Sequence, residues 1–103
     1  MRYQLVLQVS VDAFDDDAAV SALEERLRSV LADSANVDGH DIGSGRVNIF
    51  INTHDPGDSF GRCKYVLHAA DHLSSLTAAF REVDGQTYTV IWPEGSTGPF
   101  VAT

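Results

Sequence analysis

Hydrophobic and polar residues alternate in the segment from Tyr3 to Val11. The odd positions hold one tyrosine, two leucines and two valines, whereas the even positions hold Gln4, Val6, Gln8 and Ser10. Successive side chains of a strand point to opposite faces, so the odd positions are expected to face the core. The pattern predicts a half-buried strand over residues 3–11.

A second alternating segment, from Val37 to Thr53, contains Gly43-Ser44-Gly45 at the point where the chain can reverse. Two strands joined by a short glycine-containing turn are typical of a β-hairpin. The second strand of this hairpin has an apolar face and a face rich in amides: Val47, Ile49 and Ile51 alternate with Asn48, Phe50 and Asn52. The apolar face is expected to pack in the core, and the amide-rich face is expected to lie on the opposite side of the sheet.

Two helices are predicted between the strands. The first follows Asp15-Asp16-Asp17, whose carboxylates suit a helix N-terminus, and its apolar positions recur at helical spacing: Val20, Leu23, Leu27, Val30 and Leu31. It is expected to end near residues 33–35. The second begins at Asp55-Pro56, with Asp55 as the cap and Pro56 at the first helical position. Its buried stripe is Phe60, Cys63, Leu67 and Ala70, and its expected end is Asp71 or Leu73.

The C-terminal part of the chain predicts a second hairpin. Residues 79–83 and 86–92 are strand-like and flank Asp84-Gly85, a two-residue hairpin signal. Residues 94–103 are rich in turn-forming residues and have no period, which predicts a flexible tail.

The order of these elements predicts an α+β fold, namely a ferredoxin-like βαββαβ sandwich. In that fold both helices cover one face of an antiparallel sheet. The C-terminal hairpin adds an extra strand, with the segment from Phe80 to Val83 placed beside the last strand. Residues 1–93 are expected to form one domain and residues 94–103 its tail. Such a fold is compatible with many functions and selects none of them.

Charge and cysteine content narrow the class of protein. Fifteen acidic and seven basic residues give a net charge of −8, which repels nucleic acids and anionic lipids. The partners that an acidic surface favours are basic proteins or cations, and the alternative is that the charge serves solubility alone. Cys63 is the single cysteine, so no disulfide can form within the chain. The N-terminal segment lacks the apolar run of a signal peptide, and no stretch of the sequence has transmembrane length. These features predict a soluble cytoplasmic protein that does not bind membranes.

One histidine is a candidate for acid–base chemistry. His40 lies between Asp38 and Asp41, and alternation allows only Asp38 to share its face. If Ser44-Gly45 is a two-residue turn, His40 pairs with Ile49 and faces the helices, whereas a bulge would place it on the opposite face. A structural histidine and a catalytic or ligand-binding one, assisted by Asp38, are the two alternatives.

Metal and cofactor sites have little support in the sequence. His68 and His72 have the spacing of one helical turn, but no third ligand is close in sequence and Lys64 lies one turn before them. Gly43-Ser44-Gly45 leads into a strand rather than a helix, unlike a phosphate-binding loop. We therefore expect no metal site and no cofactor.

The face opposite the helices is the candidate binding surface. It is expected to gather Gln4, Val6, Gln8, Asn48, Phe50 and Asn52. An apolar centre within a rim of amides is typical of an interface, although an antiparallel sheet can also leave one face in water. Two functions follow as hypotheses. The first is an interaction or regulatory module without enzymatic activity, acting as a homodimer or on a basic partner. The second is a small-molecule sensor or cofactor-independent enzyme with His40 above a pocket near Phe50 and Trp92.

Overall fold

The computed structural model describes residues 1–96 and 98–102. Over these residues the fold is α+β, with a five-stranded antiparallel sheet in the order β2-β3-β1-β4-β5. The elements are β1 (Tyr3–Ser10), α1 (Asp17–Leu31), β2 (Ala35–Gly43), β3 (Arg46–Thr53), α2 (Pro56–Ala69), β4 (Thr77–Glu82) and β5 (Thr89–Trp92). Short 3₁₀ turns follow β1 and α1 and precede β4, at Val11–Ala13, Ala32–Ser34 and Leu73–Ser75. This arrangement is compatible with a ferredoxin-like sandwich.

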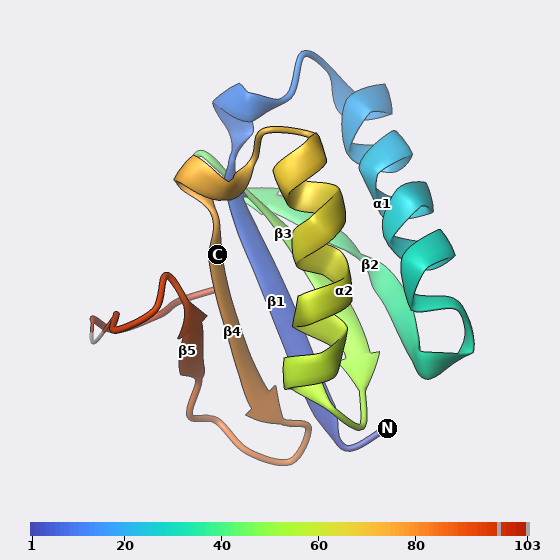
Figure 1. Cartoon of the computed structure of the whole chain (residues 1–103). Coiled ribbons are helices and arrows are strands. Elements are labelled where there is room, and N and C mark those ends of the chain that lie inside the picture. Colours follow the sequence, from blue (N-terminus) through green and yellow to red (C-terminus); the bar gives the residue numbers. More distant parts are fainter. Residues whose placement is uncertain (97, 103) are drawn as a thin grey trace.

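Both helices lie against the same face of the sheet (Figure 1). The core lies between them and the odd-numbered positions of the central strands, as the alternation predicted. Its fully buried members include Leu5, Leu7, Val9, Val47, Ile49 and Ile51 from the sheet, and Leu27, Leu31, Cys63 and Leu67 from the helices. Leu5 and Leu7 are therefore buried under the helices, in agreement with the sequence pattern.

The predicted helix starts are confirmed. The side chain of Asp16 accepts a hydrogen bond from the backbone N–H of Ala19 at 2.9 Å, and that of Asp55 accepts one from the N–H of Asp58 at 3.1 Å. Pro56 occupies the first helical turn, where its missing N–H leaves no hydrogen bond unmade. Short acidic side chains at these positions satisfy amide groups that have no partner within the helix.

Helix α2 ends before the predicted position of about Asp71 or Leu73. The helix stops at Ala69, and Asp71 adopts a left-handed conformation with φ of 60°. The backbone N–H of His72 then donates to the carbonyl of Leu67 at 2.9 Å, which closes the helix. His72 consequently lies outside the helix, so it does not share a helical face with His68.

The central hairpin has the register expected for a two-residue turn. Ser44 and Gly45 both have positive φ, as a tight turn between twisted strands requires. His40 pairs with Ile49, and the register shifts at Asp38, between Val37 and Gly39. This bulge lies on the N-terminal side of His40, so it leaves the pairing of His40 unchanged.

The C-terminal hairpin differs from the prediction in two respects. The strand beside β1 is β4, and β5 is the added edge strand, so the roles predicted for the two segments are exchanged. The connection also spans residues 83–88 instead of the two residues Asp84-Gly85. The Nη1 of Arg81 donates to the carbonyls of Glu82, Val83 and Gly85, which stabilises a wider loop. No helix in the described part of the chain is long and apolar enough to cross a membrane.

The burial of Cys63 makes a testable prediction. Its side chain is fully buried, and burial raises the pKa of the thiol to about 12, so little reactive thiolate is present at neutral pH. A maleimide or disulfide reagent should label the folded protein slowly and the protein in strong denaturant rapidly. Rapid labelling of the native protein at pH 7.5 would contradict the packing of α2 on the sheet.

Candidate functional site

The structure brings the six residues of the predicted binding surface together. Antiparallel pairing of β1 with β3 places three pairs opposite each other on the face away from the helices: Gln4 with Asn52, Val6 with Phe50, and Gln8 with Asn48. Pairing of β1 with β4 adds Ala79 beside Val6 and Arg81 beside Gln4. We call these six residues from β1 and β3 the amide face.

Burial divides the amide face into two halves. Val6 and Asn48 are fully buried and Gln8 is nearly so. In contrast, Gln4, Phe50 and Asn52 are only half-buried. A fully buried valine and asparagine on the side without helices show that other parts of the chain cover this half of the face.

The C-terminal segment contributes to that cover. The Nε2 of Gln8 donates a hydrogen bond to the carbonyl of Val101 at 2.8 Å. The ring of Phe100 packs edge-on against Tyr88, with 5.0 Å between ring centroids. Figure 1 shows the end of the chain running behind β4, on the side of the sheet opposite the helices. The flexibility predicted for residues 94–103 stays a prediction, and Thr97 and Thr103 lie outside the described residues.

Gln8 is the centre of the polar contacts on this face. Besides Val101, its Nε2 donates to the Oδ1 of Asn48 at 2.9 Å, so both hydrogens of this amide are used. The Nδ2 of Asn48 is buried without a hydrogen-bond partner among the described residues. Buried amides normally find partners for all their polar atoms, so this donor marks a place where a further acceptor would be stabilising.

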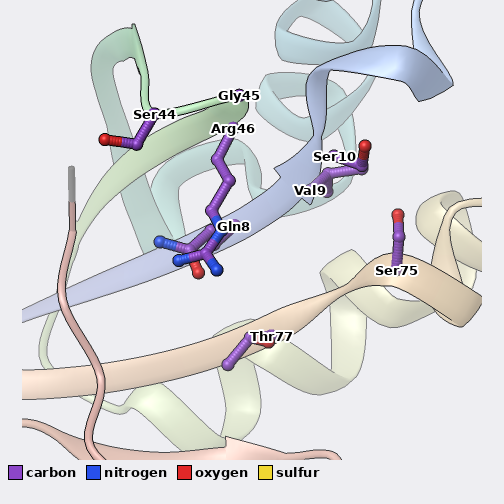
Figure 2. A pocket seen from close by; sticks show the side chains of 8 residues that line it. All are labelled: Gln8, Val9, Ser10, Ser44, Gly45, Arg46, Ser75 and Thr77. Atoms are coloured by element: carbon purple, nitrogen blue, oxygen red, sulfur yellow. The ribbon is translucent and has the colours of Figure 1, made fainter.

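A polar pocket of about 220 Å³ lies where β1, β3 and β4 meet at this end of the face. Its lining side chains come from Gln8, Ser10, Ser44, Arg46, Ser75 and Thr77, with Val9 and Gly45 completing the wall. Figure 2 shows the Arg46 side chain reaching toward Gln8, while the hydroxyl of Ser44 points away from the other labelled side chains. Hydroxyl groups and one guanidinium therefore dominate the pocket.

His40 lies on the helix side of the sheet, where it contacts α1. Its Nδ1 is 2.6 Å from the Oε1 of Glu24, a carboxylate whose side chain is only 7% exposed. A carboxylate oxygen at this distance accepts a hydrogen bond from the imidazole tautomer that carries its hydrogen on Nδ1. Arg28 lies 3.8 Å from the other oxygen of Glu24, across one helical turn. The arrangement stabilises a buried carboxylate between two donors.

The other residues grouped with His40 in the enzyme hypothesis are not assembled around it. Asp38 is exposed in the bulge and makes no hydrogen bond or ion pair with His40 among the described residues. Phe50 lies on the amide face, whereas Trp92 packs against Phe60 of α2 with 6.1 Å between ring centroids. Neither the polar pocket nor a second cavity of about 230 Å³ between α1 and α2 has His40 in its lining.

His72 is buried for a structural reason that the sequence did not reveal. Its ring packs on Phe14, with 4.8 Å between ring centroids, and its Nδ1 has no hydrogen-bond partner among the described residues. Burial lowers the pKa of His72 below its usual value, and the nearby positive charge of Arg26 acts in the same direction, although Asp71 opposes them. Within residues 1–96 and 98–102 no three histidine, cysteine or acidic side chains are grouped so that they could hold a metal ion.

Comparisons of the chain with models of known families, with curated proteins and with solved structures found no match. The site must therefore be interpreted from its own geometry.

His72 makes stability depend on pH in a defined direction. Its pKa is lower in the folded state than in the unfolded state, so the unfolded chain binds the proton more tightly. The stability that neutral His72 contributes to the folded state is present above the ordinary histidine pKa of about 6.5. It is lost as the pH falls through and below that value. Between pH 7.5 and 5.5 the free energy of unfolding, measured with urea, should fall less in His72→Phe than in the unsubstituted chain.

The substitution His68→Gln provides the control, because His68 is exposed and its loss removes one histidine without changing the buried site. It should keep the pH dependence of the unsubstituted protein. Equal slopes for all three proteins would show that His72 is not held neutral by the fold.

Proposed function

We propose that this chain is a protein-interaction module without catalytic activity and that it acts through the amide face. The observation that carries the proposal is that this face already holds a segment of polypeptide, residues 98–102, through the bond between Gln8 and Val101. Recognition of a peptide by an amide that anchors its backbone, beside apolar contacts for its side chains, is a common mode of binding. The groups that hold the chain's own segment are equally suited to a similar segment from a partner.

The contact between the C-terminal segment and the amide face is weak, which supports exchange of this segment for one from a partner. A hydrogen bond of the kind made by Gln8 contributes about 1 kcal/mol net, whereas fixing a residue of flexible chain costs roughly 1–2 kcal/mol. The packing of the half-buried Phe100 on Tyr88 supplies part of the remainder. The balance is close, so a partner segment with better contacts can displace the C-terminal segment.

The partner that we propose first is a second copy of the chain, since the segment seen on the face is its own. Exchange of residues 93–103 between two copies would give a homodimer in which each face is covered as it is here. The half-buried Phe50, with Gln4 and Asn52 beside it, offers further contact area at the same interface. The charge of −8 on each copy opposes pairing at low salt and favours a basic protein as the second class of partner.

His40 supports the same proposal. Its ring is engaged by the buried carboxylate of Glu24, and this contact gives the histidine a structural role in fixing α1 on β2. A sensor or enzyme built on His40 and Asp38 therefore has less support than an interaction module.

The proposal includes a ferredoxin-like fold and a cytoplasmic location. The order β2-β3-β1-β4 supports a ferredoxin-like βαββαβ sandwich, with β5 added outside β4. The single cysteine, buried and without a disulfide partner in the chain, supports a reducing cytoplasmic location. The acidic charge makes nucleic acid an unsuitable partner.

A peptide added in trans tests the proposed function. A chain that ends at Trp92 should bind a synthetic peptide of residues 93–103 saturably, and a peptide with the same residues in scrambled order should not bind. The full chain should bind the peptide at least about tenfold more weakly, because its own segment competes at high local concentration. Fluorescence anisotropy of the labelled peptide measures both affinities, and the NMR spectrum of the shortened chain verifies that it is folded.

Substitutions at two glutamines sharpen the test. Gln8→Ala in the shortened chain should weaken peptide binding, whereas Gln86→Ala, the same change at an exposed loop position, should leave it unchanged. The proposal is refuted if the folded shortened chain does not bind the peptide, or if the two substitutions have the same effect.

A further inference from the structure

We propose that the polar pocket beside the amide face binds a small oxyanion, in the class of phosphate and carboxylate ligands, with Arg46 as its anchoring cation. The pocket shares Gln8 with the peptide-binding contact, but the proposal does not depend on the function proposed above. Its evidence is the composition of the pocket, the unused donors around it and its size.

The lining of the pocket carries a positive charge, whereas the chain as a whole is acidic. Its lining includes one cationic side chain, Arg46, and no carboxylate, although the chain has fifteen acidic and seven basic residues. The other polar groups are the amide of Gln8 and the hydroxyls of Ser10, Ser44, Ser75 and Thr77, of which that of Ser44 points away from the other labelled side chains (Figure 2). A guanidinium with hydroxyl donors around it is complementary to the oxygens of a phosphate or carboxylate.

Arg46 is available for such a ligand. Arg2, Arg28 and Arg62 each form an ion pair with an acidic side chain, and Arg81 donates to the carbonyl groups of its loop. The Arg46 side chain makes no hydrogen bond or ion pair with the described residues. It therefore keeps its full set of donors.

Strand pairing fixes where Arg46 lies. In β3 it is opposite Ser10 of β1 and Gly43 of β2, so its side chain shares a face with Ser10 and Asn48. Figure 2 shows it extending along the sheet toward Gln8, with Ser10 and Ser75 on the other side of the pocket. Both hydrogens of Gln8 Nε2 are already used, so the donors left for a ligand are Arg46 and the three hydroxyls other than that of Ser44.

A second unused donor lies next to the pocket. The Nδ2 of Asn48 is buried and unpartnered, and the Oδ1 of the same amide is bound to Gln8, which lines the pocket. Asn48 also lies two residues beyond Arg46 on the same strand and face. Asn48 does not line the pocket itself, so the ligand is expected to contact Arg46 and the lining hydroxyls.

The volume restricts the ligand to small species. Pockets for drug-sized molecules measure roughly 300–1,000 Å³, so the 220 Å³ available here suits inorganic phosphate or a short dicarboxylate. The net charge of the chain opposes the binding of an anion. The exposed carboxylate of Asp41, which pairs with Asn48 across the hairpin, acts in the same direction. The dissociation constant is therefore expected to be in the millimolar range, and binding is expected to depend on Arg46.

NMR titration of the full ¹⁵N-labelled chain, with inorganic phosphate and succinate in separate arms at constant ionic strength, tests the site. We expect saturable shifts at Thr77, Arg46 and the side-chain amide of Gln8 with at least one probe. The arm that binds more tightly identifies phosphate or carboxylate as the preferred chemistry. Arg46→Gln should weaken binding at least tenfold.

Arg62→Gln is the matched control, because it changes the net charge equally at an exposed site on α2. It should retain the binding of the unsubstituted chain. If Arg46→Gln does not give a folded spectrum, Thr77→Val, which removes one lining hydroxyl, takes its place and should weaken binding severalfold. Shifts that do not saturate with either probe, or equal binding by the Arg46 and Arg62 variants, would overturn the proposal.

Discussion

Strand β1 lies in the middle of the sheet, and both of its faces must be covered, because Leu5, Val6, Leu7 and Val9 are all withdrawn from water. The helices cover the odd-numbered side with a continuous apolar core. In the part of the chain that the structure describes, no helix covers the even-numbered side, where Val6 lies between Phe50 of β3 and Ala79 of β4. On that side the C-terminal segment contacts β1 through the hydrogen bond between Gln8 and the carbonyl of Val101.

The even-numbered side combines apolar burial with polar groups that need partners. Gln8 donates to the Oδ1 of Asn48 on β3 and to the carbonyl of Val101 on the C-terminal segment, and these bonds join residues that are far apart in the chain. A buried amide that loses its hydrogen-bond partner is destabilising, so the bond between Gln8 and Asn48 favours one arrangement of the two side chains on this face.

Much of the fold could be predicted from local patterns. Alternation identified the buried side of β1 and β3, and the caps at Asp16 and Asp55 followed from side-chain chemistry near each helix start. The end of α2 and the width of the C-terminal loop could not be predicted, because they depend on a left-handed Asp71 and on hydrogen bonds from the Arg81 side chain to carbonyls of its own loop, which residue propensities do not reveal. For the candidate site, register alone placed the six residues of the amide face together. The cover supplied by Phe100 and Val101 is a long-range contact, and its one local signal was the apolar pair within a tail rich in turn-forming residues.

The position of the C-terminal segment on the amide face can be measured by paramagnetic relaxation enhancement with a spin label on Val101→Cys. The side chain of Val101 is exposed, whereas Cys63 is fully buried, so labelling of the native protein is selective for the new cysteine. We predict strong broadening of the side-chain amide signals of Gln8 and Asn48 and weak broadening of the amide of Tyr65 on the outer side of α2. Weak broadening throughout, with no preference for Gln8 and Asn48, would show that the segment does not cover this face and would contradict the account.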